Sequence, residues 1–172
     1  MLNVLKSVHL ALSGLFTALA LAIPLAFRGM LQFVIPTIGY SATLASHVPV
    51  MLSTLLGPSL AGLVGSASTL GFLVTLGPVV GARAATHILW GVAAAFAMKK
   101  GMSFPKALFL VALPLHSISE GLVVTLFGIP WEGALINVVG TAIHHTADSI
   151  ISLVVVRAAR PIMKSLELPG VT

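Results

Sequence analysis

The feature that most constrains the fold of this chain is a series of long, nearly uncharged stretches separated by short clusters of Gly, Pro, Lys and Arg. Charged residues make up only 8% of the sequence and hydrophobic residues 58%, whereas a soluble domain carries about 25% charged residues. A mainly apolar helix of about 20 residues is long enough to cross the hydrocarbon core of a bilayer. The sequence therefore predicts an all-α integral membrane protein.

The positions of the helix breakers predict six transmembrane helices in a single domain, residues 1–172. The second helix is the shortest, because it closes at Gly57-Pro58. Residues 29–44, which contain Pro36 and Gly39, indicate a loop or re-entrant cap before it. The predicted helices cover approximately residues 8–27, 45–56, 58–76, 79–98, 105–127 and 131–156.

The distribution of Lys and Arg predicts the orientation, because these residues collect on the cytoplasmic side of a membrane protein. With both termini in the cytoplasm, seven of the nine Lys and Arg residues lie inside, and only Arg28 and Arg83 lie outside. Five helices would place the clusters around Lys99 and Arg157 on opposite sides. We therefore expect six helices with cytoplasmic termini, in the plasma membrane of a prokaryotic cell. The net charge of +5 is then a topology signal and not a sign of nucleic-acid binding.

Ionisable residues gather in the last three predicted helices. Each costs about 2.5–3.5 kcal/mol at the bilayer centre on insertion scales, so such residues usually face a cavity or one another. Helical spacing places them in one stripe on each helix, and three stripes can converge. We predict an outward-opening pocket with its floor near the midplane. Its predicted lining is Arg83, His87, Trp90, His116, Glu120, Asn137, Thr141 and His144.

A structural role for some of these residues is the alternative. His144 and Asp148 are four residues apart and can satisfy each other, with Asp148 holding the tautomer of His144. Arg83 and Glu120 can form an ion pair instead of binding ligand. His145 is rotated by about 100° from His144 on a helix, so we expect it to point away from the pocket.

The first predicted helix carries a stripe of small residues. Gly14, Ala18 and Ala22 follow at intervals of four, and such stripes let another helix approach closely in lipid. Packing within the monomer and docking of a partner protein both remain open from this pattern.

Four segments together resemble the substrate-binding S component of energy-coupling-factor (ECF) vitamin transporters: the stripe Ala18–Ala22, His47-Val-Pro-Val-Met51, Leu56-Gly57-Pro58 and Gly62-x-x-Gly65. The resemblance implies that the helix-one groove docks a transmembrane coupling subunit driven by two ATPase subunits. It also implies a vitamin pocket in helices four to six, capped by the first extracellular loop. The wording Ser46-His47-Val48-Pro49 is similar to the Met-His-Ile-Pro form of the niacin and pantothenate branch.

The sequence thus predicts a non-enzymatic subunit, without a cofactor, that binds a small vitamin or precursor with high affinity for uptake. A carboxylate such as niacin or pantothenate is favoured, because Arg83 can hold it in a bidentate pair. One alternative is a stand-alone proton-coupled transporter using Glu120, His144 and Asp148. The other is an intramembrane metal enzyme that uses His116, His145 and Asp148.

Overall fold

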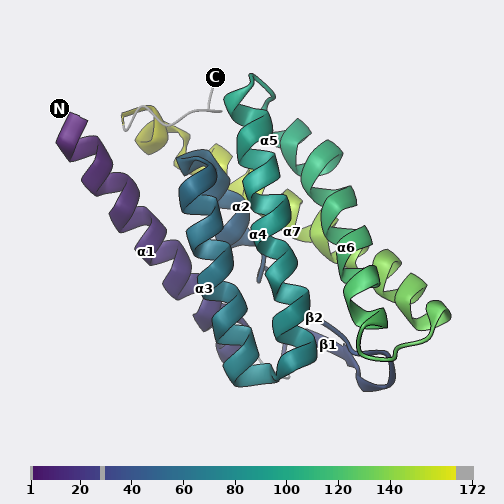
Figure 1. The fold of residues 1–172 in the computed structure, drawn as a ribbon. Helices are drawn as coiled ribbons and strands as arrows, with labels where there is room; N and C mark the ends of the chain where they lie inside the picture. The colour runs from purple at the N-terminus through teal and green to yellow at the C-terminus, as the bar shows by residue number, and fades with distance from the viewer. Residues whose placement is uncertain (1, 28–29, 166–172) are drawn as a thin grey trace.

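Five helices in the structure are long and apolar enough to cross a membrane, which confirms the prediction of an all-α membrane protein. The structure, a computed structural model, describes residues 2–27 and 30–165; Arg28, which we expected on the outer side, lies outside these residues. Figure 1 shows the helices side by side in one bundle. They are α1 (Leu2–Ala26), α3 (Pro58–Leu76), α4 (Pro78–Lys99), the helix over 104–125 and α7 (Trp131–Ser165).

Gly-Pro pairs start α3 and α4. Gly57 has φ 106° and Gly77 has φ 86°, a backbone region that favours glycine because it has no Cβ. The following Pro58 and Pro78 occupy the first helical position, where the missing N–H has no helical partner to lose. These pairs therefore turn the chain sharply and begin the next helix at once.

The helix over 104–125 is not uniform. It comprises α5 (Phe104–Lys106), a π-helical segment η3 (Ala107–Ala112) and α6 (Leu113–Thr125). Pro114 has no N–H to donate to the preceding turn, which favours a local departure from α-helical bonding. His116 and Glu120 follow on α6, one turn apart.

The predicted second span, residues 45–56, is not a long helix. It forms α2 (Val48–Ser53) and the 3₁₀ turn η2 (Thr54–Leu56), of six and three residues. Together they rise about 15 Å, half of the roughly 30 Å hydrocarbon core. Six long spans are therefore not confirmed.

The chain before α2, which we predicted as a loop or re-entrant cap, folds as a hairpin. β1 (Gln32–Ile35) pairs antiparallel with β2 (Tyr40–Thr43), joined by η1 (Pro36–Ile38). In Figure 1 this hairpin lies at the end of the bundle opposite the start of α1 and the end of α7. From the hairpin, β2, α2 and η2 lead the chain back through the bundle. Non-helical backbone is tolerated at membrane depth only when protein buries it, and α2 contacts α1, α3, α4 and α7.

Helices α3 and α4 pack closely against each other at Gly65. A Cβ on Gly65 would come within 3.0 Å of the backbone nitrogen of Ile88 and 3.1 Å of the carbonyl carbon of His87. Both contacts are to backbone, which cannot rotate aside. Gly65 therefore brings the two helices together at the level of His87.

Candidate functional site

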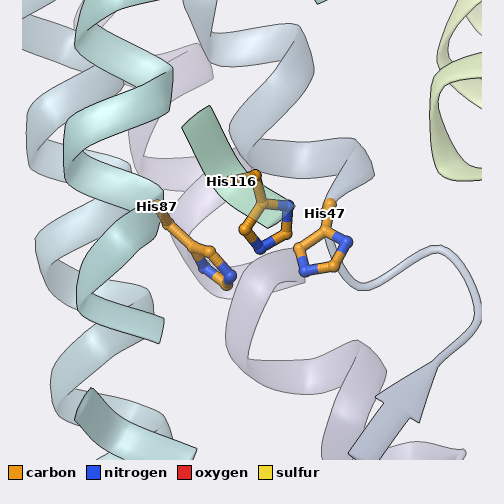
Figure 2. A group of neighbouring side chains, drawn as sticks. All are labelled: His47, His87 and His116. Atoms are coloured by element: carbon orange, nitrogen blue, oxygen red, sulfur yellow. The ribbon is translucent and has the colours of Figure 1, made fainter. Parts of the chain in front are cut away.

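The polar stripes of the last three helices converge in the interior, around a histidine from the chain before α2. We call this group the histidine cluster; its members are His47, His87, His116, His144, His145 and Asp148. Figure 2 shows the rings of His47, His87 and His116 turned toward a common space. Their ring centroids lie 4.6–5.3 Å apart, and all three side chains are buried.

His47 is the central member of the cluster, and we did not predict it as a site residue. Its ring centroid lies 4.5 Å from that of His144, 4.6 Å from that of His116 and 4.8 Å from that of His87. It immediately precedes α2, which we expected to be a separate span. The signal in the sequence is the His47-Val-Pro segment itself, a histidine just before a proline-initiated helix.

Arg83 and Glu120 form a buried ion pair, the structural alternative considered from the sequence. Arg83 donates to Glu120 Oε2 from Nη2 at 2.6 Å and from Nε at 3.2 Å, and the hydroxyl of Thr141 donates to the same oxygen at 2.6 Å. The Arg83 guanidinium also lies 5.3 Å from the ring centre of Tyr40. Burial raises the pKa of the Tyr40 hydroxyl, so this ring stays neutral and Glu120 balances the charge of Arg83.

Several predicted pocket residues bind the backbone of residues 38–47, which we call the connector. Arg83 donates from Nη1 to Gly39 O at 3.0 Å and from Nη2 to Ser41 O at 3.3 Å. Asn137 Nδ2 donates to Ile38 O at 2.9 Å, and His144 Nε2 donates to Thr43 O at 2.9 Å. In this conformation these hydrogen bonds hold the connector in its place over the histidine cluster; we call them, with those of Asp148, the seat of the connector.

Asp148 completes the seat of the connector. Its Oδ1 accepts from Ala45 N at 2.7 Å, and its Oδ2 accepts from His47 N at 3.0 Å. The same Oδ2 lies 3.2 Å from His144 Nε2, as the predicted pairing requires. A carboxylate therefore persists in an apolar helix because it satisfies two backbone N–H groups, one buried and one partly buried. A buried N–H group without an acceptor would cost about 1–3 kcal/mol.

As predicted, His145 does not line the same cavity as His144, but it belongs to the histidine cluster on the side of α6. It is fully buried, and its Nδ1 lies 2.9 Å from His116 Nδ1. One of these nitrogens is protonated and donates a hydrogen bond to the other. Two adjacent faces of α7 are covered by protein at this level. His144 faces the connector and His145 faces α6. The roughly 100° between the two side chains therefore does not direct His145 toward lipid.

Trp90 forms a wall of the cluster. It is fully buried, with its ring centroid 5.3 Å from those of His116 and His145 and 5.7 Å from that of His87. Of the eight residues predicted to line a pocket, the structure thus brings His87, His116, His144 and Trp90 together at the histidines. The others, Arg83, Glu120, Asn137 and Thr141, lie in the ion pair and the connector seat.

The space beside the cluster is small. A cavity of about 30 Å³ is lined by polar groups that include Ser46, His47, Arg83, His87, Glu120 and His144. A water occupies about 10–15 Å³ of such a volume, so this cavity holds about two waters and no vitamin. A larger hollow of about 880 Å³ lies between the hairpin and α7, but its lining is almost entirely apolar, with His144 at its wall. The polar side chains that could bind a solute or an ion therefore line the small cavity.

Two groups within the described residues have the composition of a metal site. They are His47 with His87 and His116, and His47 with His144 and Asp148; in each group the ligand atoms lie within 4.8 Å of one another. The set weighed from the sequence, His116 with His145 and Asp148, is neither of these. His47 replaces His145 because the connector inserts it between α4, α6 and α7.

No known protein family, curated protein or solved structure matches this chain.

Proposed function

We propose that this protein is the binding and delivery subunit of an ATP-driven transporter, as its resemblance to ECF S components implies. The observation that carries the proposal is the presence, in one small bundle, of a sealed polar site and an unpartnered helix face of small residues. The first feature suits capture of a solute and the second suits docking. With both termini in the cytoplasm, the hairpin lies on the outer side, where solute arrives.

The histidine cluster is the proposed binding site, and the connector is its cover. Release of the connector frees the donors of Arg83 and Asn137, which hold Gly39, Ser41 and Ile38 in the closed arrangement. Arg83 then binds the carboxylate of a niacin- or pantothenate-like vitamin, and the space vacated by the connector supplies the volume that the 30 Å³ cavity lacks. The protein itself performs no reaction in this scheme.

The exposed stripe on α1 supports the docking half of the proposal. Gly14, Ala18 and Ala22 are all exposed, and a Cβ built on Gly14 meets nothing within 4 Å. α1 packs on its neighbours through other residues, among them Ser13 and Ala20, which are buried. The small residues are thus not buried by packing within the monomer, and we propose that they bind the transmembrane coupling subunit.

Ala18→Leu is expected to reduce co-purification with a coexpressed coupling subunit and its two ATPases by at least tenfold, because a bulky side chain holds the two helices apart. Thermal unfolding in detergent should be unchanged, since Ala18 is exposed in the monomer. Ala158→Leu, at an exposed position of α7, is the matched control and should leave the complex intact. A fall in the melting temperature of Ala18→Leu alone would assign the stripe to internal packing.

One observation favours the proton-coupled transporter as the second candidate. Asp148 is buried, contacts His144 and His47, and the contacts continue from His47 to His116 and His145. Chains of carboxylates and histidines in membrane interiors carry protons in pumps and transporters. Glu120 is less suited to this role than we predicted, because Arg83 holds it as an ion pair.

A further inference from the structure

We propose that His47, His87 and His116 form a binding site for a divalent transition-metal ion, with the imidazole nitrogens as ligands. The proposal deepens the proposed function, and it rests on that function for the role of the cluster as ligand site. One ligand nitrogen from each histidine lies within 4.8 Å of the others. Tetrahedral bonds of about 2.0–2.1 Å place ligand nitrogens about 3.3 Å apart, so modest side-chain rotations close the site.

The second nitrogen of each ring lies near a polar group on its outer side. His116 Nδ1 lies 2.9 Å from His145 Nδ1. His47 Nδ1 lies 3.1 Å from Asp148 Oδ2 but is not in hydrogen-bond geometry. His87 Nδ1 lies 3.4 Å from Ser68 Oγ. Histidines that bind metal almost always donate their other N–H to such a partner, which fixes the tautomer. The arrangement thus presents Nε2 of each ring as the ligand atom.

The Nε2 atoms are available for coordination. Across residues 2–27 and 30–165, the Nε2 of His47 and the Nε2 of His87 have no hydrogen-bond partner. His116 Nε2 is 3.2 Å from Glu120 Oε1 but is not in hydrogen-bond geometry, and it is buried without a donor or acceptor. The buried Nε2 of His116 is costly without a partner, whereas His47 and His87 line the small cavity; a metal ion there would give a partner to all three nitrogens.

The other possible group, His47 with His144 and Asp148, is already in use. His144 Nε2 lies 2.9 Å from Thr43 O and 3.2 Å from Asp148 Oδ2. Asp148 accepts from Ala45 N and His47 N. Coordination there would break the seat of the connector, whereas the group with His87 and His116 leaves it intact.

The charges of the interior would also accommodate a cation. Glu120 is paired with Arg83, but the ion-pair neighbours of the fully buried Asp148, within the part of the chain that the structure describes, are His47 and His144. A buried carboxylate needs a compensating charge. A divalent ion bound to the three neutral imidazoles would supply this compensating charge. Its remaining positive charge could bind an anionic fourth ligand, either a hydroxide or the carboxylate of a bound solute. The cavity of about 30 Å³ has room for such a donor atom.

The donor set selects the class of ion. Three imidazole nitrogens favour borderline ions such as Co²⁺, Ni²⁺ and Zn²⁺ over Mg²⁺ and Ca²⁺, which prefer oxygen ligands. Three protein ligands with an open fourth position are typical of sites that exchange a water or a bound molecule. The site therefore suits an ion that also holds a further ligand.

The test is a titration of tag-free, chelator-treated protein in detergent with Co²⁺, followed by visible absorption and calorimetry. We expect one Co²⁺ per chain, with the intense visible bands of four-coordinate Co²⁺. Zn²⁺ added afterwards should abolish the colour, because Zn²⁺ is d¹⁰. Absence of stoichiometric binding, or only the weak spectrum of six-coordinate aqueous Co²⁺, overturns the proposal without any variant.

Variants locate the ion. His87→Ala should weaken Co²⁺ binding more than about 100-fold, since loss of an outer-shell partner alone typically costs about 10–100-fold. His144→Ala, which removes a ligand of the other group only, should change affinity by less than about tenfold, and His9→Ala on α1 should not change it. Unchanged binding in monodisperse His87→Ala overturns the assignment. His87→Gln replaces His87→Ala if the latter elutes as aggregate.

The metal site and the proposed function fail separately. If Co²⁺ does not bind but the complex with the coupling subunit forms and depends on Ala18, the metal site alone is overturned. If Co²⁺ binds as expected but no complex forms in coexpression, the delivery role fails and the metal site stands.

Discussion

Arg83→Gln is expected to lower the free energy of unfolding by about 3–5 kcal/mol, the usual cost of removing one partner from a buried ion pair. Glu120 would remain in the interior with Thr141 and His116 but without a counter-charge. The connector would also lose the donors to Gly39 O and Ser41 O. Thermal and chemical unfolding in detergent, followed by circular dichroism, measures the change.

Two further variants separate the charge from the packing. Arg157→Gln, at an exposed position of α7, should change stability by less than about 0.5 kcal/mol, as surface substitutions usually do. The double variant Arg83→Met with Glu120→Leu should recover a large part of the loss, because apolar replacements of a whole buried pair are often tolerated. Equal, small effects of Arg83→Gln and Arg157→Gln would show that Arg83 is only an interfacial anchor.

Asp148→Ala is expected to destabilise the protein by about 1–4 kcal/mol, because it leaves a buried backbone N–H group without an acceptor, at about 1–3 kcal/mol, and a partly buried one at a smaller cost. These are the N–H groups of Ala45 and His47. The loss should be concentrated in the connector, so hydrogen exchange of residues 38–47 should accelerate more than that of α3 or α4. Asp148→Asn keeps one acceptor oxygen and should lie between wild type and Asp148→Ala.

Ser149→Ala is the matched control for Asp148→Ala. Ser149 is the next residue and is equally buried, and its hydroxyl makes a weak contact with Met51 Sδ at 3.9 Å. Its substitution should cost less than about 1 kcal/mol. Comparable losses from both variants, or uniform acceleration of exchange throughout the bundle, would contradict the role of Asp148 as the seat of the connector.

Helical periodicity was enough to predict which residues of the last three helices meet. Arg83 and His87 on α4, His116 and Glu120 on α6, and His144 with Asp148 on α7 are each one turn apart, and in each pair both members reach the interior. The physical reason is that an ionisable side chain is costly on a lipid-facing surface, so it faces the interior of the bundle. The five long apolar helices were predictable for the same reason.

The long-range contacts of the connector, and the short helix that follows it, were not predictable from periodicity. Hydropathy treats residues 45–56 as a span, whereas the chain there is a turn and a short helix buried by its neighbours. The backbone groups of the connector form hydrogen bonds with side chains about 40 to 100 residues away in sequence, such as those of Arg83 and Asp148. These long-range contacts bring His47 into the cluster, and no local pattern encodes them. The contact between His145 and His116 of α6 is also long-range and was not predicted.

Uptake into proteoliposomes tests the delivery role most directly. Wild-type protein is reconstituted alone, and with the coupling subunit and two ATPases, in vesicles with or without ATP or a pH gradient. The probes are radiolabelled niacin and pantothenate, together with any small molecule that mass spectrometry finds in the purified protein. We predict binding without turnover by the protein alone, and accumulation only with the complete module and ATP. Accumulation driven by a pH gradient in vesicles that hold this chain alone would contradict the account and identify a proton-coupled carrier.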